Sequence, residues 1–459
     1  MKISEYLLEK YNQPVPRYTS YPPANHFSDD FSENDYNQLL KQSNKGYPEN
    51  ISIYLHIPYC KKLCYYCGCN MCMLTNTQEV KAYIDALKKE IKLTAAQIDK
   101  KRKVSQIHYG GGTPNSIPAE YLQEINELLF SEFQFIENPE IAIETNPAYL
   151  DEKYIAALKK AKFNRFSLGI QDFDKKVLDA VNRERTVIPV PELMEMLKDG
   201  DPNIHINLDF IYGLPGQTVK SFTQTMEKAA EMRPDRLVTF SYAHVPWIKP
   251  HQKVLEKKGL PGPEEKMEMF LTAREQLQKS GYLPVGLDHF VLPEDELGQA
   301  LSDKMLHRNF QGYCTRHTTG QVYAFGVTSI SQLADGFKQN TKDIKEYIAS
   351  INENKIPVIK GLQLNDEEKI VGEVLNEFMC NKQIYWAETA KRLGISEEKL
   401  KSTISLNIDE LKAFEADGLM YYKPKGLSIN ETGELFIRNI AASLDPAYNP
   451  ASKQYSKSV

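Results

Sequence analysis

The sequence predicts an α/β protein whose parallel sheet curves into a full or partial barrel. Between residues 51 and 243, six short β-type runs alternate with amphipathic helical stretches. Most of these runs are rich in Ile, Val, Leu and Phe, which is typical of strands that are covered on both faces. Consecutive strand-then-helix units favour parallel strands with the helices packed outside them.

The six predicted strands are short, and the stretches between them have helical periodicity. Apolar residues recur at helical spacing in 79–98 and 119–130. The segment 183–203 fits the alternation least well, because its three prolines leave room only for a short helix at 192–198. Another β-type run, 283–287, is a candidate extension of the sheet. The predicted strands are residues 51–57, 104–109, 141–144, 165–170, 204–211 and 236–242.

Segments of different character flank the predicted barrel. Residues 1–50 are polar, with a Pro- and Tyr-rich stretch at 14–23, and are expected to form an extended arm with no core of its own. From about residue 365 the pattern predicts a small winged-helix-like domain. Its predicted helices are 366–380, 386–393, 397–417 and 434–443, and its predicted strands are 419–422 and 427–430. We therefore expect an arm at 1–50, a barrel with its extension at 51–360, and a smaller, mainly helical domain at 361–459.

Composition and charge narrow the range of functions. The chain has 459 residues, of which 41% are hydrophobic, so it can bury a large core. Its formal net charge of −5 offers no overall basic surface for a nucleic acid or an anionic membrane. No apolar run is long enough to span a bilayer, and the first ten residues lack the apolar core of a signal peptide. We expect a cytoplasmic monomer that binds neither nucleic acid nor membrane.

Five of the seven cysteines lie within thirteen residues, directly after the first predicted strand. A disulfide framework would spread its cysteines and belongs to an oxidising compartment, so this clustering indicates a metal site. Cys60, Cys64 and Cys67 have C-x3-C-x2-C spacing. Structural zinc sites more often use two paired arms, and no second arm is visible. Cys69 is a candidate spare ligand, but it is expected to point elsewhere because one residue separates it from Cys67.

This spacing predicts an iron–sulfur cluster held by three thiolates. A cubane cluster has four irons, so a loop with three ligands leaves one iron open to an external chelate. The arrangement is typical of the radical S-adenosylmethionine (SAM) superfamily, in which the amino and carboxylate groups of SAM occupy the open iron. We expect a [4Fe–4S] cluster on Cys60, Cys64 and Cys67. The three remaining cysteines are expected to be inert thiols, and they are Cys72, Cys314 and Cys380.

The other predicted strands also end in glycine or polar residues, where a parallel barrel gathers its chemistry. Gly110, Gly111 and Gly112 follow the second strand, and glycines there let the backbone approach a ligand closely. For each polar residue taken singly, a structural hydrogen bond or a helix cap is the simpler explanation. Their recurrence at the same end of successive strands predicts a lined pocket. These polar residues are Glu144, Gln171, Asp172, Arg183, Asp209, Tyr242 and His244.

Seven motifs, spread over nearly the whole chain, resemble a known family. Two of them are specific, namely the arm motif at 16–22 and the motif His-Arg-Asn-Phe-Gln-Gly-Tyr at 307–313. The other five are the cysteine loop with its extra Cys69 and the stretches 110–114, 169–173, 181–183 and 211–215. On these motifs the chain resembles the oxygen-independent coproporphyrinogen III oxidases, which belong to the radical SAM superfamily. The resemblance implies a partial (β/α)6-type radical SAM barrel.

The same resemblance implies an activity, its cofactors and its site residues. The activity is oxidative decarboxylation of two propionates of coproporphyrinogen III to vinyl groups, which gives protoporphyrinogen IX in anaerobic haem biosynthesis. The implied cofactors are a [4Fe–4S] cluster and two SAM molecules, with an electron donor such as flavodoxin or ferredoxin. For the first SAM it suggests Tyr54, Gly111, Glu144 and Ile330, and for the second Tyr66, Gly112, Thr113, Gln171, Arg183, Asp209 and Ala243. Phe310 and Gln311 match residues near the substrate, and with Tyr54, Glu144 and Ile330 they form the implied catalytic set.

A tetrapyrrole with four carboxylates needs cationic or hydrogen-bonding partners. Four residues are candidates by their sequence setting, although each is equally consistent with a surface charge. Two tyrosines of the arm, Tyr18 and Tyr21, can pack on the macrocycle or dock the arm on the barrel. The four candidate partners are Arg17, His307, Arg308 and Arg316.

Two other functions stay open at this point. A radical SAM methyltransferase that acts on haem and opens its ring would share the cysteine loop. A haem chaperone without decarboxylase activity would keep the cluster, but such relatives tend to lack the arm motif and to have a residue other than cysteine at position 69. Both features of this chain favour the oxidase.

Overall fold

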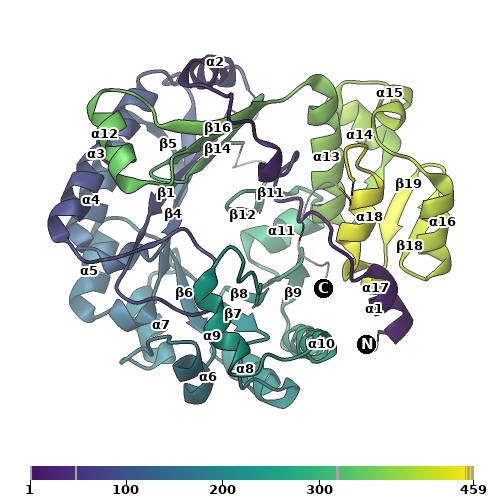
Figure 1. Cartoon of the computed structure of the whole chain (residues 1–459), viewed down its shortest axis with the longest axis horizontal. Coiled ribbons are helices and arrows are strands. Elements are labelled where there is room, and N and C mark those ends of the chain that lie inside the picture. Colours follow the sequence, from purple (N-terminus) through teal and green to yellow (C-terminus); the bar gives the residue numbers. More distant parts are fainter. Residues whose placement is uncertain (1–2, 47–48, 317–319, 450, 452–454, 456–459) are drawn as a thin grey trace.

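A twelve-stranded sheet forms the centre of the protein in the computed structural model (Figure 1). The structure describes residues 3–46, 49–316, 320–449, 451 and 455. The seven strands at the middle of this sheet run parallel, which confirms the six predicted strands. In spatial order they are β13 (Gln321–Phe325), β1 (Ile51–Ile57), β4 (Lys103–Gly111), β5 (Gln134–Thr145), β6 (Arg165–Gln171), β7 (His205–Tyr212) and β8 (Arg236–Ser241).

Antiparallel strands extend both edges of the parallel region. On one side lie β14 (Ile330–Leu333), β15 (Gly336–Asn340) and β16 (Val358–Gln363), which the sequence did not predict. On the other side β10 (His289–Val291) pairs with β8, and β9 (Leu283–Val285) pairs with β10. The expected strand at 283–287 is therefore shorter than predicted. In the strand order β16 and β9 are the two edges, so the sheet is an open, partial barrel.

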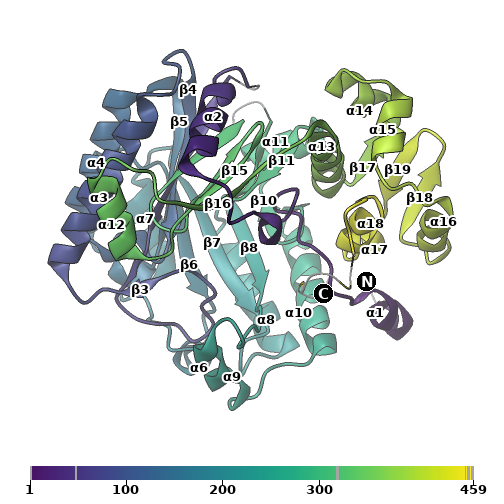
Figure 2. The same cartoon turned by 45° about the horizontal axis from the view of Figure 1, so that its top comes forward.

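Helices cover the outer face of the sheet, as Figure 2 shows for α3 and α4. In α3, buried apolar residues recur at helical spacing, among them Val80, Ile84, Leu87 and Ile91. The proline-interrupted segment holds the short α7, as predicted. The helices that follow or flank the parallel strands are α3 (Thr77–Ala95), α4 (Ala119–Glu132), α5 (Glu152–Lys160), α6 (Lys175–Ala180), α7 (Val190–Lys198), α8 (Val219–Glu231), α9 (Lys253–Glu256), α10 (Pro263–Lys279), α11 (Glu296–Ser302) and α12 (Ile344–Asn352).

The arm is not the extended segment that its composition suggested. It contains α1 (Glu5–Tyr11) and α2 (Glu33–Ser43), because Ser4 caps the first helix and Ser32 with Asp35 forms a capping box at the second. Tyr36, Leu39 and Leu40 of α2 belong to the core of the barrel. Between the two helices, Ser28 and Gly361 exchange backbone hydrogen bonds of 2.8 and 3.0 Å, so the arm also covers part of the β16 edge.

The C-terminal part packs its own apolar core beside the barrel (Figure 1). The predicted helix at 397–417 is two helices, because Asn407 caps a new helix through a hydrogen bond from Glu410 N. Tyr11, Tyr18 and Tyr21 of the arm join this core. Its elements are α13 (Asp366–Asn381), β17 (Gln383–Tyr385), α14 (Trp386–Leu393), α15 (Glu397–Thr403), α16 (Ile408–Ala416), β18 (Met420–Lys423), β19 (Gly426–Ile429), α17 (Glu431–Glu434) and α18 (Ile437–Ser443).

A separate hairpin joins the two halves of the molecule. It consists of β11 (Leu306–Asn309) and β12 (Gly312–Thr315), which pair antiparallel. The Asn376 side chain of α13 donates to the Arg308 carbonyl at 2.7 Å, and Asn309 and Gln311 line the barrel interior. The hairpin therefore places the predicted 307–313 motif between the C-terminal domain and the barrel. In the described part of the chain, none of the helices combines the length and apolarity needed to cross a membrane.

Candidate active site

The cysteine loop lies at the carboxyl ends of β1 and β4. Two short strands at its base, β2 (Tyr59–Cys60) and β3 (Cys72–Met73), pair parallel to each other. The glycine-rich turn after β4 supports the loop from below, since Gly112 N donates to Ile57 O at 2.8 Å and Thr113 N donates to Tyr59 O at 2.9 Å. The loop and the Gly-Gly-Gly-Thr motif are thus one structural unit.

Three thiols of this loop lie close to one another. Cys60 is buried, Cys64 and Cys67 are half-buried, and all three are free. Burial, with a smaller contribution from the neighbouring Cys67 and Cys64 sulfurs, raises the pKa of Cys60 to about 12, although a hydrogen bond with Thr113 Oγ1 at 3.2 Å opposes the rise. Soft thiol donors on one short loop suit iron–sulfur ligation, and binding of the metal would drive off their protons. No group of three or more His, Cys, Asp or Glu placed for a single ion occurs in the described residues.

The sequence position of Cys69 suggested that it points away from the other cysteines, but in the structure it faces Cys67. The side chain is exposed, but its thiol hydrogen-bonds to the Cys67 sulfur. This hydrogen bond is the main reason why the pKa of Cys67 falls to about 6. In an extended chain, neighbouring side chains point to opposite faces, but the tight backbone turn after Cys67 changes these directions. The turn brings the thiols of Cys67 and Cys69 together, and the sequence does not show this turn.

The motif Val181-Asn182-Arg183 clamps one side of the loop. Asn182 Nδ2 donates to Leu63 O at 2.7 Å, and Tyr65 N donates to Val181 O at 3.0 Å. Arg183 Nη1 lies 3.8 Å from Cys64 Sγ, and its Nη2 donates to Gly169 O at 2.5 Å. The Arg183 Nε atom is buried and has no hydrogen-bond partner in the part of the chain that the structure describes, so this guanidinium retains an unused donor beside the thiols.

Three residues that the sequence did not single out clamp the other side. Lys249 Nζ donates to Cys69 O at 2.6 Å, and His251 Nε2 lies 2.8 Å from Cys67 O. Gln252 is fully buried, and its Nε2 donates to the carbonyls of Tyr66 at 3.0 Å and Ala243 at 3.3 Å. These residues follow β8 in a loop without a recognisable motif, so only the structure identifies them.

Tyr54 of β1 and Glu144 of β5 meet through a residue between them. The Tyr54 ring stacks on His108 of β4 with 6.0 Å between the ring centres, and His108 Nε2 lies 3.0 Å from Glu144 Oε1. Burial on its own would lower the pKa of His108, but the Glu144 carboxylate raises it above its usual value. His108 lies two positions before Gly110 in a strand that also holds Ser105 and Gln106, and its place on the same face as Gln106 was the available sequence signal.

The turn glycines are needed because side chains of the site crowd them. Gly111 has φ +115°, and an added Cβ would lie 2.7 Å from the His56 ring. A Cβ on Gly112 would lie 2.6 Å from Pro58 O. Atoms of β1 and of the residue that follows it make these close contacts, and the approach of the glycine backbone to a ligand stays a prediction.

Two predicted residues, Asp209 and Gln171, lie on β7 and β6, where unpredicted neighbours hold the Asp209 carboxylate. Ser167 Oγ donates to Asp209 Oδ2 at 2.5 Å, and Asn207 Nδ2 donates to Asp209 Oδ1 at 2.7 Å. Burial raises the pKa of Asp209 to about 6. Gln171 ends β6 in a left-handed conformation with φ 71°. The predicted Ile330 lies two strands from Tyr54, since β14 pairs with β13 and β13 pairs with β1.

Other predicted strand-end residues serve the scaffold. Asp172 is buried and accepts hydrogen bonds from Gln217 and Thr225, so it fixes α8. Tyr242 and His244 hydrogen-bond to each other at 2.9 Å, and His244 also contacts Glu256. These contacts agree with the simpler explanation for strand-end polar residues.

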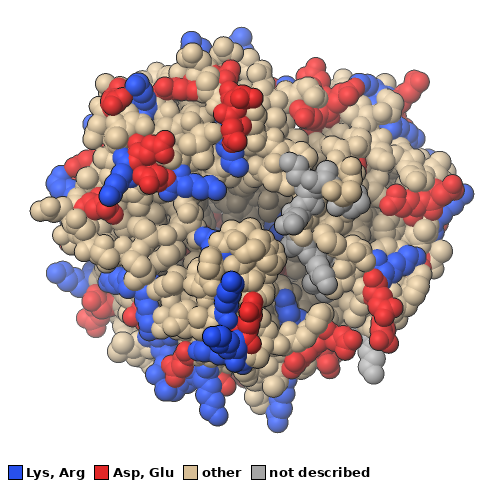
Figure 3. Space-filling model, viewed as in Figure 1, with Lys and Arg blue, Asp and Glu red and all other residues tan. Residues whose placement is uncertain are grey.

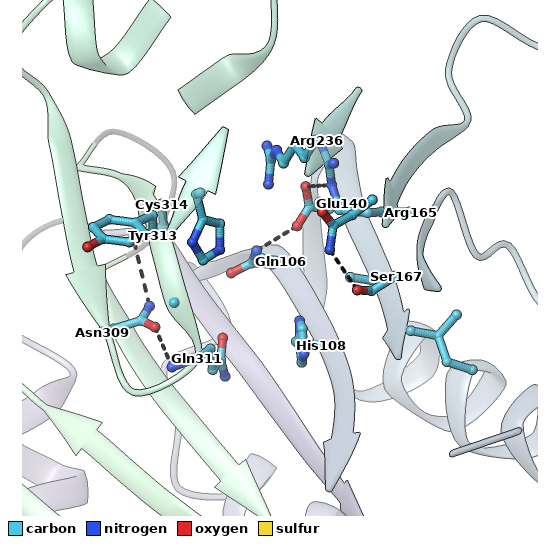
Figure 4. A pocket seen from close by; sticks show the side chains of 15 residues that line it. Gln106, His108, Glu140, Arg165, Ser167, Arg236, Asn309, Gln311, Tyr313 and Cys314 are labelled. Atoms are coloured by element: carbon cyan, nitrogen blue, oxygen red, sulfur yellow. Dashed lines mark hydrogen bonds and ion pairs between the residues drawn. The ribbon is translucent and has the colours of Figure 1, made fainter. Parts of the chain in front are cut away.

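A cavity of about 90 Å³ occupies the interior of the barrel (Figure 4). Its wall combines inward-facing residues of β4 to β8 with the hairpin, as the figure shows for Gln106, Arg165 and Gln311. Both polar atoms of the Gln311 amide are buried without a partner among the described residues, whereas the neighbouring Phe310 ring packs on Phe27 and Phe337. The lining residues missed in the sequence are polar residues at inward strand positions: Gln106, His108, Glu140, Arg165, Ser167, Asn207, Arg236 and His289.

The arm tyrosines and two candidate carboxylate partners have structural contacts of their own. Tyr18 and Tyr21 are buried, and their hydroxyls donate to Asp445 at 3.0 and 2.8 Å, so they dock the arm on the C-terminal domain and not on the barrel. Arg316 forms an ion pair with Glu373 at 2.7 Å. Burial lowers the pKa of His307 to about 4, which leaves this imidazole uncharged at neutral pH. Arg17 and Arg308 retain capacity for a ligand, as described below.

A partial parallel barrel with three thiols on the loop after its first strand defines a radical SAM enzyme. Residues 54–229 match the Radical SAM superfamily. Oxygen-independent coproporphyrinogen III oxidase of Synechocystis sp. is 38% identical over 99% of this chain and 97% of that protein, and the Escherichia coli enzyme is 37% identical over 96% and 94%. The solved structure of E. coli coproporphyrinogen III oxidase superposes with a TM-score of 0.86 at 35% identity and covers 95% of this chain and 100% of that chain.

The chain belongs to the oxygen-independent coproporphyrinogen III oxidase family. This membership confirms the resemblance seen in the sequence and the barrel fold that it implied. It also decides between the oxidase and the two alternatives, the haem-degrading methyltransferase and the haem chaperone, in favour of the oxidase.

Proposed function

We propose that the protein converts coproporphyrinogen III to protoporphyrinogen IX by oxidative decarboxylation of two propionate side chains. One observation carries the proposal: the three-thiol loop lies at the barrel end where Tyr54, His108 and Glu144 meet, in a chain whose full-length relatives are named for this substrate. Each decarboxylation breaks one C–H bond and the bond to the carboxylate carbon, forms one C=C bond and releases carbon dioxide. One hydrogen atom and one electron leave per propionate, the electron to a one-electron acceptor protein.

We assign a [4Fe–4S] cluster to Cys60, Cys64 and Cys67 and two SAM molecules to the surrounding strand ends. With SAM, the bound cluster supplies the abstraction of a hydrogen atom from an unactivated carbon, which no protein side chain can do. The donor set fits these groups, because soft thiols suit iron and carboxylates suit ribose hydroxyls and an ammonium group. The first SAM is assigned to Tyr54, Gly111, Glu144 and Ile330, and the second to Tyr66, Gly112, Thr113, Gln171, Arg183, Asp209 and Ala243.

The remaining task of the chain is orientation. His108 Nε2 lies 3.0 Å from Glu144 Oε1, and this contact fixes the direction of the carboxylate. Ser167 and Asn207 fix the Asp209 carboxylate in the same way from the next strand. The unpartnered amide of Gln311 points into the interior from the opposite wall and can hydrogen-bond the tetrapyrrole. Such fixed polar groups in a water-poor interior place one substrate carbon for reaction.

We further infer that the enzyme works as a monomer in the cytoplasm and takes electrons from flavodoxin or ferredoxin. The reducing conditions of that compartment keep thiols available for iron, in agreement with the seven free cysteines.

Anaerobic reconstitution tests the function directly. The purified chain is loaded with iron and sulfide, reduced, and supplied with SAM and coproporphyrinogen III. We expect 5′-deoxyadenosine, carbon dioxide and one new vinyl group in equal amounts, with protoporphyrinogen IX as the final tetrapyrrole. Cleavage of SAM without decarboxylation, or methylation and opening of a haem ring, would contradict the proposal.

A further inference from the structure

The hairpin carries a buried arginine at the edge of the cavity. Arg308 is 8% exposed, and its Nε atom has no hydrogen-bond partner among the described residues. Its guanidinium carbon lies 5.0 Å from the centre of the Tyr313 ring, and Tyr313 lines the cavity. A buried cation with an unsatisfied donor costs free energy, so this side chain has capacity for an anionic ligand.

The arm brings a second arginine to the same place. Arg308 Nη1 donates to the Arg17 carbonyl at 3.4 Å, and Arg438 of α18 donates to the carbonyls of Val15 and Pro16. Tyr18, the next residue, is buried. The backbone around Arg17 is therefore held from both sides, whereas its own side chain is exposed and forms no hydrogen bond or ion pair within the described structure.

Positive charge is in excess around this pair. Burial, together with the nearby Arg17 and Arg308, lowers the pKa of Arg438 to about 9. Asp288 is the carboxylate that both arginines influence, and it already pairs with His289 Nδ1 at 2.7 Å. An added carboxylate would therefore meet a favourable potential here.

The size of the cavity places the macrocycle at its open side. A cavity of about 90 Å³ suits one side chain of a tetrapyrrole but not its four linked rings. The face in Figure 3 is hollowed near its centre, over the barrel. Arg17 influences both Tyr212, the last residue of β7, and Asp288, so it lies near the carboxyl ends of the strands at this open side.

We propose that Arg17 and Arg308 together bind one propionate carboxylate of the tetrapyrrole, one that stays intact during the reaction. The site rests on the proposed function and specifies how the substrate is held. Two guanidiniums present planar pairs of donors that match the two oxygens of a carboxylate. The arm contributes one of them, so binding of the substrate ties the arm motif to the 307–313 motif. Anchoring one propionate fixes the macrocycle and selects which other propionate enters the barrel.

Binding of a tetrapyrrole that does not react tests the site without turnover. Coproporphyrin III, the oxidised and fluorescent form with four propionates, is titrated anaerobically into the cluster-loaded enzyme without SAM. Its affinity for Arg17→Gln and Arg308→Gln should fall about tenfold or more, the usual scale for a lost charge-assisted hydrogen bond. Arg17→Lys should recover part of the loss. The tetramethyl ester of coproporphyrin III should bind all variants with similar affinity.

Arg233→Gln is the matched control, because this exposed arginine precedes β8 at the opposite end of the strand. It should bind coproporphyrin III like the unmodified enzyme.

Two results would overturn the proposal. One is an equal loss of affinity for coproporphyrin III and for its tetramethyl ester, since the arginines would then only hold the arm. The other is unchanged binding of coproporphyrin III by Arg17→Gln. If the acid discriminates between variants but no vinyl product forms, the site stands and the proposed function fails. If vinyl product forms with an unchanged KM in Arg17→Gln, the function stands and the site fails.

Discussion

His108 Nε2 lies 3.0 Å from Glu144 Oε1, on neighbouring parallel strands beneath the cysteine loop. Tyr54 stacks on the other side of the imidazole. Glu144 and Tyr54 are both assigned to the first SAM, so His108 is the residue that sets the position of one relative to the other. The hydrogen bond and the stack join β1, β4 and β5 into one rigid side of the site.

Removal of the Glu144 carboxylate should lower the pKa of His108. In Glu144→Gln, burial remains and disfavours the imidazolium, while the main opposing interaction is lost. An NMR pH titration of the His108 ring in the cluster-free protein measures this change. A titration midpoint equal to that of the unmodified protein would contradict the geometry.

The same pair predicts how stability depends on pH. The pKa of His108 is raised in the folded state, so the pair stabilises the fold fully below the pKa of an unfolded histidine, and this stabilisation is lost as pH rises through the folded pKa. The difference in denaturation midpoint between the unmodified protein and Glu144→Gln should therefore be largest in mildly acidic buffer and shrink at alkaline pH. A difference that grows with pH has the wrong sign for this mechanism.

Cys64→Ser should abolish both the visible iron–sulfur absorbance and the cleavage of SAM. One of three cluster ligands is lost, and a serine hydroxyl does not replace a thiolate. Cys72→Ser is the matched control, since this half-buried thiol lies outside the C-x3-C-x2-C set and should keep both properties. Iron and sulfide content after anaerobic reconstitution, together with 5′-deoxyadenosine yield, decides the matter. Full turnover by Cys64→Ser would refute the ligand assignment.

The parallel strands at the centre of the sheet could be predicted, because strands buried on both faces have runs of apolar residues in the sequence. Ile51–Ile57, for example, is a strand with the bounds expected from its sequence. The strand Gln321–Phe325, which pairs with β1, was missed because it is not part of a strand-then-helix unit. Its place in the sheet depends on backbone pairing with residues that are distant in the sequence. The break between α15 and α16 was missed because Asn407 acts as a cap only once the chain turns there.

The site was predictable where chain topology gathers residues. Glu144 and Asp209 lie near the carboxyl ends of parallel strands, and such ends meet at one side of a barrel. His108 was not predictable in this way, because nothing in the sequence sets it apart from Ser105 and Gln106 of the same strand or shows its contact with Glu144. Gln252 depends on a loop conformation, and the direction of Cys69 depends on the turn after Cys67. The periodicity of apolar and polar residues does not specify these loop and turn conformations.

Glu90 of α3 should be among the residues most important for stability. It is fully buried and accepts hydrogen bonds from Gly326 N at 2.8 Å, Asn340 Nδ2 at 2.7 Å and Tyr347 Oη at 2.6 Å, with Lys338 Nζ at 3.4 Å. Glu90→Ala leaves the buried Lys338 ammonium without its carboxylate, which typically costs about 3–5 kcal/mol. Chemical denaturation followed by circular dichroism measures the loss.

Two comparisons separate the charge from the packing at Glu90. Glu353→Ala removes an exposed carboxylate that pairs with Lys355 at 2.8 Å, and it should leave the denaturation midpoint almost unchanged. The double variant Glu90→Gln with Lys338→Met should recover part of the loss, because no buried charge is then left unpaired. An equal loss in Glu90→Ala and Glu353→Ala would show that the buried network contributes nothing.

Gln252→Ala should loosen the cysteine loop without removing a cluster ligand. The buried amide donates to Tyr66 O and Ala243 O and accepts from Val245 N at 2.7 Å, so it ties the loop to the chain that follows β8. Its loss removes three hydrogen bonds from partly buried backbone groups, and the loop should open more often. The reconstituted variant should therefore release its iron to a chelator several-fold faster, while its iron content at the start is normal. Lys253→Ala, which changes the adjacent exposed residue, is the matched control. Equal release rates for the two variants would show that Gln252 fills space but does not hold the loop.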